Sequence, residues 1–228
     1  MQPALHGEEQ RLLLRRLLEN GAVLFGDVIH SRFGLHSPIY FDLRASLYSH
    51  PELLWSVGKQ FAEKICELTR DDPKPQCAVG IPDTATPLAL ATALYSWQQG
   101  TRPAISYGLL RKEAKTYPGL APSHWIGTRD PACEYNLLDD VVASGSTKRA
   151  AAAKMNAEGI SPRRIIVLFD REQGDGLRND GFELHGIFRV PEILDFYLQE
   201  NLISSETHDK VCAFLRCRRF DSTPALKG

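Results

Sequence analysis

The sequence has no uninterrupted apolar stretch of the length that a membrane-spanning helix needs, roughly 18 residues or more. Its first residues, MQPALHGEEQRLLLRRLLENG, are rich in leucine, but Arg15 and Arg16 interrupt them. The apolar run is therefore too short and too charged for the core of a secretory signal peptide. These absences predict a cytoplasmic protein without a membrane partner.

Neither sign of charge is in excess. The 27 lysine and arginine residues nearly balance the 28 aspartate and glutamate residues, so the formal net charge is −1. Such a chain has no global field to gather a polyanion, and it lacks a basic helix or an aromatic and basic sheet face. We therefore expect no nucleic-acid partner, and any anion site must be local.

Cysteine is sparse and irregularly spaced. The five cysteines, Cys66, Cys77, Cys133, Cys212 and Cys217, are odd in number and form no CxxC pair. This pattern argues against the common zinc and redox motifs, and we expect reduced thiols.

What the sequence does contain is a regular alternation of strand and helix patterns over 228 residues, enough for one large α/β domain. After a helix over 8–20 and a β-prone stretch over 22–44, strands are expected at 77–81, 103–110, 133–140, 163–170 and 182–188. Helices are expected at 51–68, 86–97, 146–159, from 191 and from about 205. This order indicates a parallel sheet covered on both faces, which binds ligands beyond the carboxyl ends of its strands. The chemistry should lie after residues 81, 110, 138 and 169.

The strongest local signal is LLDDVVASGST over 137–147, an apolar strand that ends in two acids and continues through small residues into a helix. Unhindered amides at a helix N-terminus, aided by hydroxyls, suit a phosphate group. Asp139 and Asp140 would repel that anion, so they suit ribose hydroxyls, a developing positive charge or Mg²⁺. The alternative is a simple turn and helix cap with both acids solvated.

This segment closely resembles the signature that binds phosphoribosyl pyrophosphate (PRPP) in type I phosphoribosyltransferases. SPIYFDLR (37–44), GIPDTATPLA (80–89), RKEAK (111–115) and FDREQG (169–174) narrow the resemblance to orotate phosphoribosyltransferase and to the corresponding half of UMP synthase. The implied fold is α/β, with a central parallel sheet of about five strands flanked by helices. Within a single domain over 1–228, residues 1–45 and a late strand would form a hood, 46–200 the core, and 201–228 a C-terminal helix and tail.

The resemblance implies Mg²⁺-dependent transfer of ribose 5-phosphate from PRPP to orotate, which gives orotidine 5′-monophosphate and pyrophosphate. Lys112, Lys115, Asp139 and Asp140 would be catalytic. The residues assigned to PRPP are Arg111, Asp83, Thr84, Ala85, Val141, Val142, Ala143, Ser144, Gly145, Ser146 and Thr147. Mg²⁺ would be held mainly through PRPP, with its protein ligands open, and the cationic 111–115 loop would serve the partner's site in a homodimer.

Orotate is assigned to Arg32, Phe41 and Arg171 by the same resemblance. A guanidinium fork matches a carboxylate, so Arg171 suits the orotate carboxylate. Phe41 could stack on the base, although a core aromatic is the commoner fate of such a residue. The alternative for Arg111, Lys112 and Lys115 is that they belong to a solvated run of charged residues. The alternative for the 81–86 segment is a strand-to-helix turn in which Thr84 or Thr86 is the helix N-cap.

Two segments depart from the family pattern. The family's Leu-Lys-Ser-Gly is replaced by His30-Ser31-Arg32-Phe33-Gly34, and Arg32 keeps the charge of that lysine without its compact shape. After RKEAK, the segment from Tyr117 to Trp125 contains two prolines in place of a glycine-rich hinge. Transfer to another acidic heterocycle and a non-catalytic PRPP-binding regulator therefore stay open as alternatives. The basic tail after Leu215 has no assigned role.

Overall fold

The computed structural model of the protein describes residues 7–30, 35–71, 74–101, 104–116, 118–119 and 121–217. The helices of this part of the chain are α1 (Glu8–Glu19), α2 (Leu43–Ser49), α3 (Pro51–Leu68), α4 (Thr86–Gln98), α5 (Ser146–Ala157), α6 (Asp175–Asn179), α7 (Val190–Gln199) and α8 (Ser205–Cys217). The strands are β1 (Val23–His30), β2 (Leu35–Phe41), β3 (Gln76–Gly80), β4 (Ser106–Lys115), β5 (Ser123–Ile126), β6 (Glu134–Val142), β7 (Pro162–Asp170) and β8 (Glu183–Arg189).

A six-stranded sheet of order β5-β4-β3-β6-β7-β8 forms the centre of the molecule. Its strands are parallel except β5, which pairs antiparallel with β4 at one edge. The predicted parallel sheet of about five strands is confirmed, and β5 adds a sixth, antiparallel strand at its edge. The extra strand, β5, has four residues and no apolar run, so its pairing with β4 rather than its own pattern defines it.

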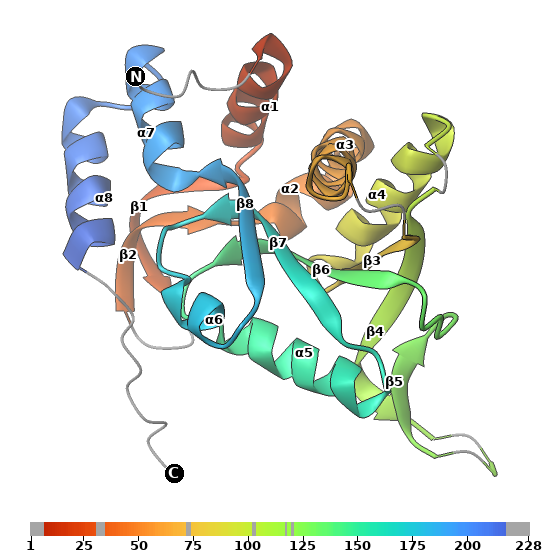
Figure 1. Ribbon diagram of the computed structural model, residues 1–228. Coiled ribbons are helices and arrows are strands. Elements are labelled where there is room, and N and C mark those ends of the chain that lie inside the picture. Colours follow the sequence, from red (N-terminus) through yellow and green to blue (C-terminus); the bar gives the residue numbers. More distant parts are fainter. Residues whose placement is uncertain are drawn as a thin grey trace.

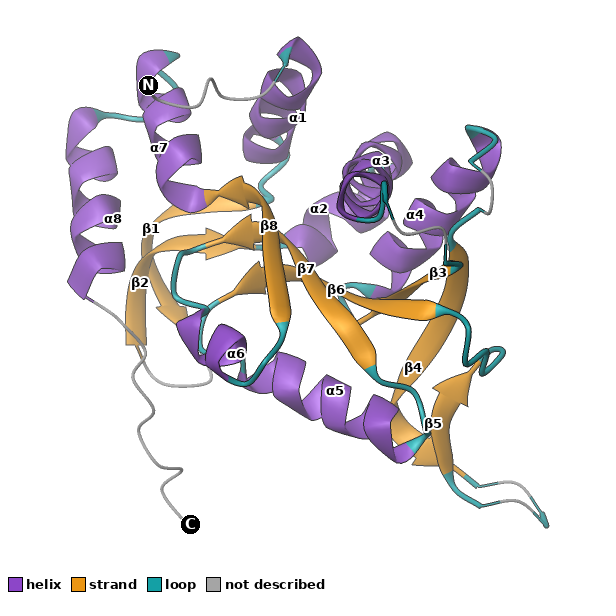
Figure 2. Ribbon diagram, viewed as in Figure 1, coloured by secondary structure: helices purple, strands orange, loops and turns teal. Residues whose placement is uncertain are grey.

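Helices cover both faces of this sheet. α3 and α4 pack on one face, and α5 and α6 lie against the other (Figures 1 and 2). Successive strand residues point to opposite faces. Leu138 and Ile166 accordingly join the core cluster that includes α3 and α4, whereas Leu137 and Ile165 join the cluster that includes α5. Burial on both faces is why these strands have continuous apolar sequences.

A smaller layer stands at the β8 side of the molecule, where the β1–β2 hairpin lies beside α7 and α8 (Figure 1). The hydroxyl of Tyr197 on α7 donates to the carbonyl of Leu14 on α1 at 2.8 Å, and its ring meets Phe25 edge-on. Strand β8 does not belong to this layer, since it pairs with β7 in the main sheet. The late strand of the expected hood, if it is β8, is thus part of the main sheet, and the role of the hairpin layer as a hood stays a prediction.

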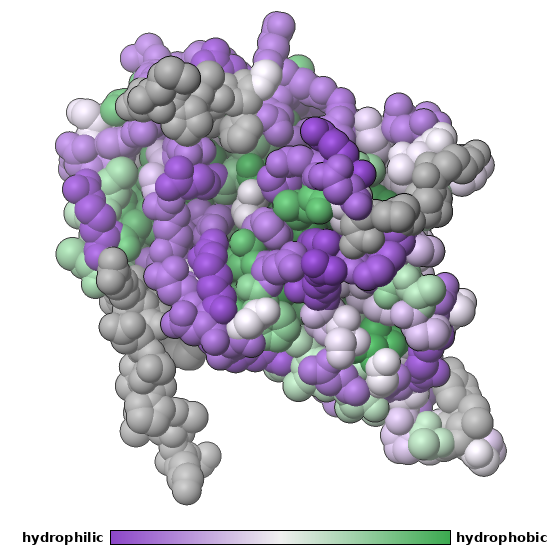
Figure 3. Space-filling view, viewed as in Figure 1, coloured by the Kyte–Doolittle hydropathy of each residue, from purple (hydrophilic) through white to green (hydrophobic). Residues whose placement is uncertain are grey.

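The outer surface in this view is mostly hydrophilic, with hydrophobic side chains in small separate patches (Figure 3). None of the helices in the described part of the chain combines the length and apolar composition that crossing a membrane requires.

Candidate functional site

The carboxyl ends of β3, β4, β6 and β7 lie at one edge of the sheet because these strands are parallel. The amide of Ile81, just after β3, donates to the carbonyl of Leu138 in β6 at 2.9 Å. This bond ties the start of the 81–85 loop to the strand that carries Asp139 and Asp140. The segments predicted to carry chemistry therefore come together at this edge.

The 143–147 loop connects β6 to α5 and has the geometry of an anion cradle. Gly145 is the N-cap of α5 and has a left-handed backbone with φ +78°. A Cβ added there would lie 2.6 Å from Cγ of Leu177 on α6, so the turn requires glycine in both conformation and volume. Glycine has no side chain to cap the first-turn amides of α5, and these amides can donate to an anion. Arg149 braces the loop by donating to the Ser144 carbonyl at 2.9 Å.

The two acids at the end of β6 occupy different environments. Asp139 is 5% exposed and forms an ion pair with Lys148 of α5. The alternative in which both acids are solvated is therefore wrong for Asp139. Asp140 is partly exposed by surface area, yet burial of its carboxyl group and the neighbouring Asp139 raise the pKa of Asp140 to about 7. This arrangement suits a group that becomes charged when a cation or electron-poor ligand arrives.

The cationic residues Arg111, Lys112 and Lys115 lie on β4 itself, which corrects the expectation that they lie on a loop after a strand ending at 110. Lys112 Nζ is 3.7 Å from Oδ2 of Asp83 in the 81–85 loop. Arg111 Nη1 donates to the carbonyl of Ser123 on β5 at 3.3 Å. β4 and β5 form a hairpin at one edge of the sheet (Figure 1). Tyr117 lies outside the described residues.

The turn end of this hairpin is fixed to the end of α5. The Glu158 carboxylate accepts from the backbone amide of His124 at 2.5 Å and from the hydroxyl of Ser123 at 2.9 Å. Arg129 pairs with the same carboxylate at 2.6 Å. These contacts hold the hairpin that carries Lys112 against the end of α5.

The 81–85 loop folds tightly back on the end of β3. A Cβ on Gly80 would lie 2.0 Å from the Ala85 carbonyl oxygen, so glycine alone permits this approach. Asp83 is exposed, Thr84 is half-buried and Ala85 is buried. The N-cap of α4 is Ala85, so the alternative in which Thr84 or Thr86 is the N-cap residue is wrong. The peptide bond between Pro82 and Asp83 is cis.

Of the residues predicted to contact the base, Arg171 follows β7 directly and is buried. Its guanidinium carbon lies 5.6 Å from the ring centroid of Phe214 on α8. Phe41 is 7% exposed and stacks on Phe169 with centroids 4.5 Å apart, so in this structure it is a core aromatic. Arg32 lies outside the described residues.

Sequence reasoning missed Lys148 and Phe214 as neighbours of predicted site residues. A lysine in the first turn of a helix resembles any solvated surface lysine, and Phe214 fits the apolar face of its own helix. The local sequence pattern does not reveal either contact, because Lys148 meets Asp139 and Phe214 meets Arg171 only through tertiary packing.

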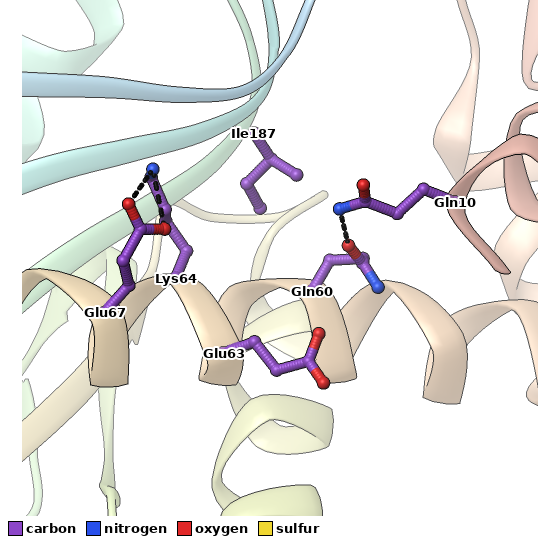
Figure 4. Close-up of a pocket in the computed structure, with 6 residues that line it drawn as sticks. All are labelled: Gln10, Gln60, Glu63, Lys64, Glu67 and Ile187. Carbon is purple, nitrogen blue, oxygen red and sulfur yellow. Dashed lines mark hydrogen bonds and ion pairs between the residues drawn. The ribbon is translucent and has the colours of Figure 1, made fainter. Parts of the chain in front are cut away.

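A pocket of about 210 Å³ lies elsewhere, between α1, α3 and β8 (Figure 4). Four of its polar lining residues pair with one another: Gln10 donates to Gln60 at 2.6 Å, and Lys64 pairs with Glu67 at 3.0 Å. None of the predicted site residues lines it. The candidate site is thus an open edge of the sheet, not this pocket.

No protein-family model matches the chain. The chain is 32% identical over 226 residues to uridine 5′-monophosphate synthase of Bos taurus, which covers 94% of this chain and 44% of the relative. It therefore spans less than half of that relative's length. It is 31% identical over 187 residues to orotate phosphoribosyltransferase of Chlamydia caviae, which covers 81% of this chain and 84% of the relative.

Among solved structures, UMP synthase of Leishmania donovani matches with a TM-score of 0.75 and 26% identity, over 93% of this chain and 43% of that one. This likeness confirms the predicted type I phosphoribosyltransferase fold. The sheet-edge geometry and the near-complete coverage of the Chlamydia caviae relative lead to one conclusion: the chain belongs to the orotate phosphoribosyltransferase family.

Proposed function

We propose that the protein transfers ribose 5-phosphate from PRPP to orotate, giving orotidine 5′-monophosphate and pyrophosphate. The observation that carries this proposal is the 143–147 segment, an uncapped helix N-terminus that follows the last residues of β6, the strand that carries Asp139 and Asp140. Membership of the family supports orotate as the acceptor.

The proposed roles follow from where charge develops in the reaction. Pyrophosphate leaves the ribose C1 carbon through an oxocarbenium-like transition state, so negative charge grows on the leaving group and positive charge grows on the sugar. The 143–147 loop would hold the 5-phosphate, and Asp139 and Asp140 would face the ribose side. No nucleophilic side chain is needed, since a nitrogen of the orotate anion attacks.

The pyrophosphate would lie between the 81–85 loop and the cations of β4. Asp83, Thr84 and Ala85 form the loop side, and Arg111, Lys112 and Lys115 form the cationic side. Cations placed where charge grows stabilise the transition state more than the bound substrate. Lys112 lies beside the 81–85 loop, where it forms an ion pair with Asp83.

Mg²⁺ fits this site as an ion carried by the substrate. In the described part of the chain, no group of three His, Cys, Asp or Glu side chains could hold a metal by itself. Mg²⁺ commonly keeps waters and binds through substrate phosphates with one or two carboxylates. Bound with PRPP, it would offset the negative charge of the pyrophosphate oxygens.

Arg171 is proposed to bind the orotate carboxylate. It is a buried guanidinium at the carboxyl end of β7, beside the proposed ribose site on β6. Phe41 is a core aromatic that stacks on Phe169. This stacking packs the end of β7, two residues before Arg171. Arg32 stays a prediction.

We also propose a homodimer, with α4 at its interface. Leu90, Leu94 and Trp97 are 43%, 48% and 68% exposed and follow one face of α4, whose other face is buried on the sheet. A helix that is apolar on both faces is normally covered on both. α4 contains no charged residue, so a second copy related by a two-fold axis would bring no like charges together.

A cytoplasmic location fits the five free thiols, since disulfides are rare in reducing compartments.

Calorimetric titration of the full chain with PRPP and Mg²⁺ tests the proposal. We expect saturable binding that Ser144→Pro weakens strongly, because proline removes an amide from the 143–147 loop. Absence of PRPP binding to the folded wild-type protein would overturn the proposal. PRPP binding by a protein that shows no turnover in an activity assay would favour the alternative of a non-catalytic PRPP-binding regulator.

A further inference from the structure

Lys148 is a buried lysine that the predicted roles do not use. It is 4% exposed and stands third in α5, directly behind the 143–147 loop. Its ammonium group donates to Oδ2 of Asp139 and, at 2.5 Å, to the carbonyl of Val141. It therefore links the helix to both sides of Asp140 along β6.

This position is unfavourable for a lysine on general grounds. Burial disfavours the charged ammonium, and a cation in the first turn of a helix opposes the helix dipole. An apolar side chain would fit a helix face against a sheet without these costs. The compensation visible in the structure is the contact with Asp139 and the Val141 carbonyl.

The contacts of Lys148 make the two acids unequal. Both carboxylate oxygens of Asp139 are engaged by the protein: Oδ2 accepts from Lys148, and Oδ1 accepts from the backbone amide of Asp140 at 3.0 Å. Oδ1 of Asp140 accepts from the amide of Val141 at 2.7 Å, and no lysine or arginine is paired with this carboxylate among the described ion pairs. By residue surface Asp140 is the more exposed of the two acids, although its carboxyl group is buried enough to raise its pKa.

We propose that Lys148 is a positioning residue for the acid pair: it commits Asp139 to the protein and leaves Asp140 as the carboxylate that meets the ribose. This proposal rests on the proposed function. The contact with the Val141 carbonyl additionally fixes the chain where it leaves β6 for the 143–147 loop. Lys148 acts through these groups and does not itself touch the substrate.

The arrangement also sets the charge felt by Asp140. The charged groups acting on it are Asp139 on its own strand, which raises its pKa, and Lys148 from α5, which lowers it. Asp140 must be ionised to stabilise an electron-poor sugar. Removal of Lys148 should therefore move the acid limb of kcat/KM to higher pH, and neutralisation of Asp139 should move it to lower pH.

The test compares Lys148→Met, Asp139→Asn and the double variant with wild type over a pH series, using PRPP, Mg²⁺ and orotate. Lys148→Met should lower kcat about tenfold to a hundredfold, with a smaller change in the KM for PRPP. The acid limb of its kcat/KM profile should move to higher pH by about one unit or more. Asp139→Asn should shift the limb the other way, and the double variant should return it towards wild type. Lys210→Met, an exposed lysine on α8, is the matched control.

A second readout needs no turnover. Carboxyl ¹³C NMR of the unliganded protein, with the Asp140 signal assigned through Asp140→Asn, follows the titration of Asp140 directly. Opposite shifts in Lys148→Met and Asp139→Asn support the proposal even if orotate is not the acceptor. If Lys148→Met folds and the pKa of Asp140 does not move, the proposal is overturned. If Lys148→Met does not fold, an unmoved pKa of Asp140 in Asp139→Asn overturns it. An inactive wild type with the expected NMR shifts would count against the proposed function alone.

Discussion

Lys112 on β4 and Asp83 after β3 form an ion pair across the open edge of the sheet, with Nζ 3.7 Å from Oδ2. The two residues lie 29 positions apart in the sequence, and both side chains are exposed. Such a pair contributes little to stability. The pair instead places an exposed ammonium group beside the loop proposed to hold pyrophosphate.

Lys112→Ala should therefore reduce turnover far more than PRPP affinity. Loss of one charge that acts on the departing pyrophosphate should cost kcat about a hundredfold to a thousandfold. Steady-state kinetics and calorimetric PRPP binding measure the two effects separately. Lys210→Ala, on α8, should change neither. Equal losses of turnover and affinity in Lys112→Ala would contradict a transition-state role.

Gly145→Ala should damage the 143–147 loop more than backbone strain alone would. Gly145 and Gly159 both have left-handed backbones, at φ +78° and +75°, but a Cβ at Gly145 meets Leu177 at 2.6 Å and one at Gly159 meets nothing within 4 Å. Either alanine should cost about 1 kcal/mol of unfolding free energy for its backbone. Gly145→Ala should lose about 2 kcal/mol more through the clash, and with it PRPP binding.

Denaturant unfolding and calorimetry of the two glycine variants make this comparison. Equal stability and equal PRPP affinity would show that the loop tolerates a side chain, contrary to its proposed contact with the 5-phosphate.

Asp140→Asn should stabilise the protein at alkaline pH while abolishing turnover. The pKa of Asp140 is raised to about 7 in the fold, against about 3.9 in an unfolded chain. A raised pKa means that the stability associated with the protonated group is complete below about pH 4 and is lost as the pH rises through about 7. Asparagine stays neutral and avoids that loss.

Thermal unfolding between pH 4 and pH 8 checks this expectation. The melting temperature of Asp140→Asn should exceed that of wild type at pH 8, and the difference should vanish towards pH 4. Asp71→Asn, at an exposed turn, serves as the control and should show no such trend. A destabilised Asp140→Asn at pH 8 would mean that its carboxylate is satisfied by the fold.

The predictable parts of this protein are those with a local cause. The apolar runs of β3, β6 and β7 follow from the needs of a doubly covered sheet, and the small residues of 143–147 from a tight turn into a helix. Strand β4 continues through RKEAK because β5 pairs with it, and a charge run gives no sign of that partner. The burial of Lys148 likewise depends on Asp139, which lies on another element.

The exposed face of α4 provides a test of assembly. Trp97→Glu should convert the proposed dimer into a monomer, because two buried carboxylates would meet near the two-fold axis. Sedimentation velocity measures the change, and turnover should fall with it if the hairpin of one subunit serves the other. Leu12→Glu places the same charge on an exposed leucine of α1, 56% exposed against 68% for Trp97, and should leave the assembly intact. A monomeric wild type that is fully active would contradict the shared site.

The most direct measurement is pyrophosphate release from PRPP and Mg²⁺ with a panel of acceptors that contains orotate, uracil and purines. Release that depends on orotate, and on none of the other bases, is the predicted result. Release with another acidic heterocycle but not with orotate would contradict the assigned acceptor. No release with any base, from a protein that still binds PRPP, would contradict catalysis itself.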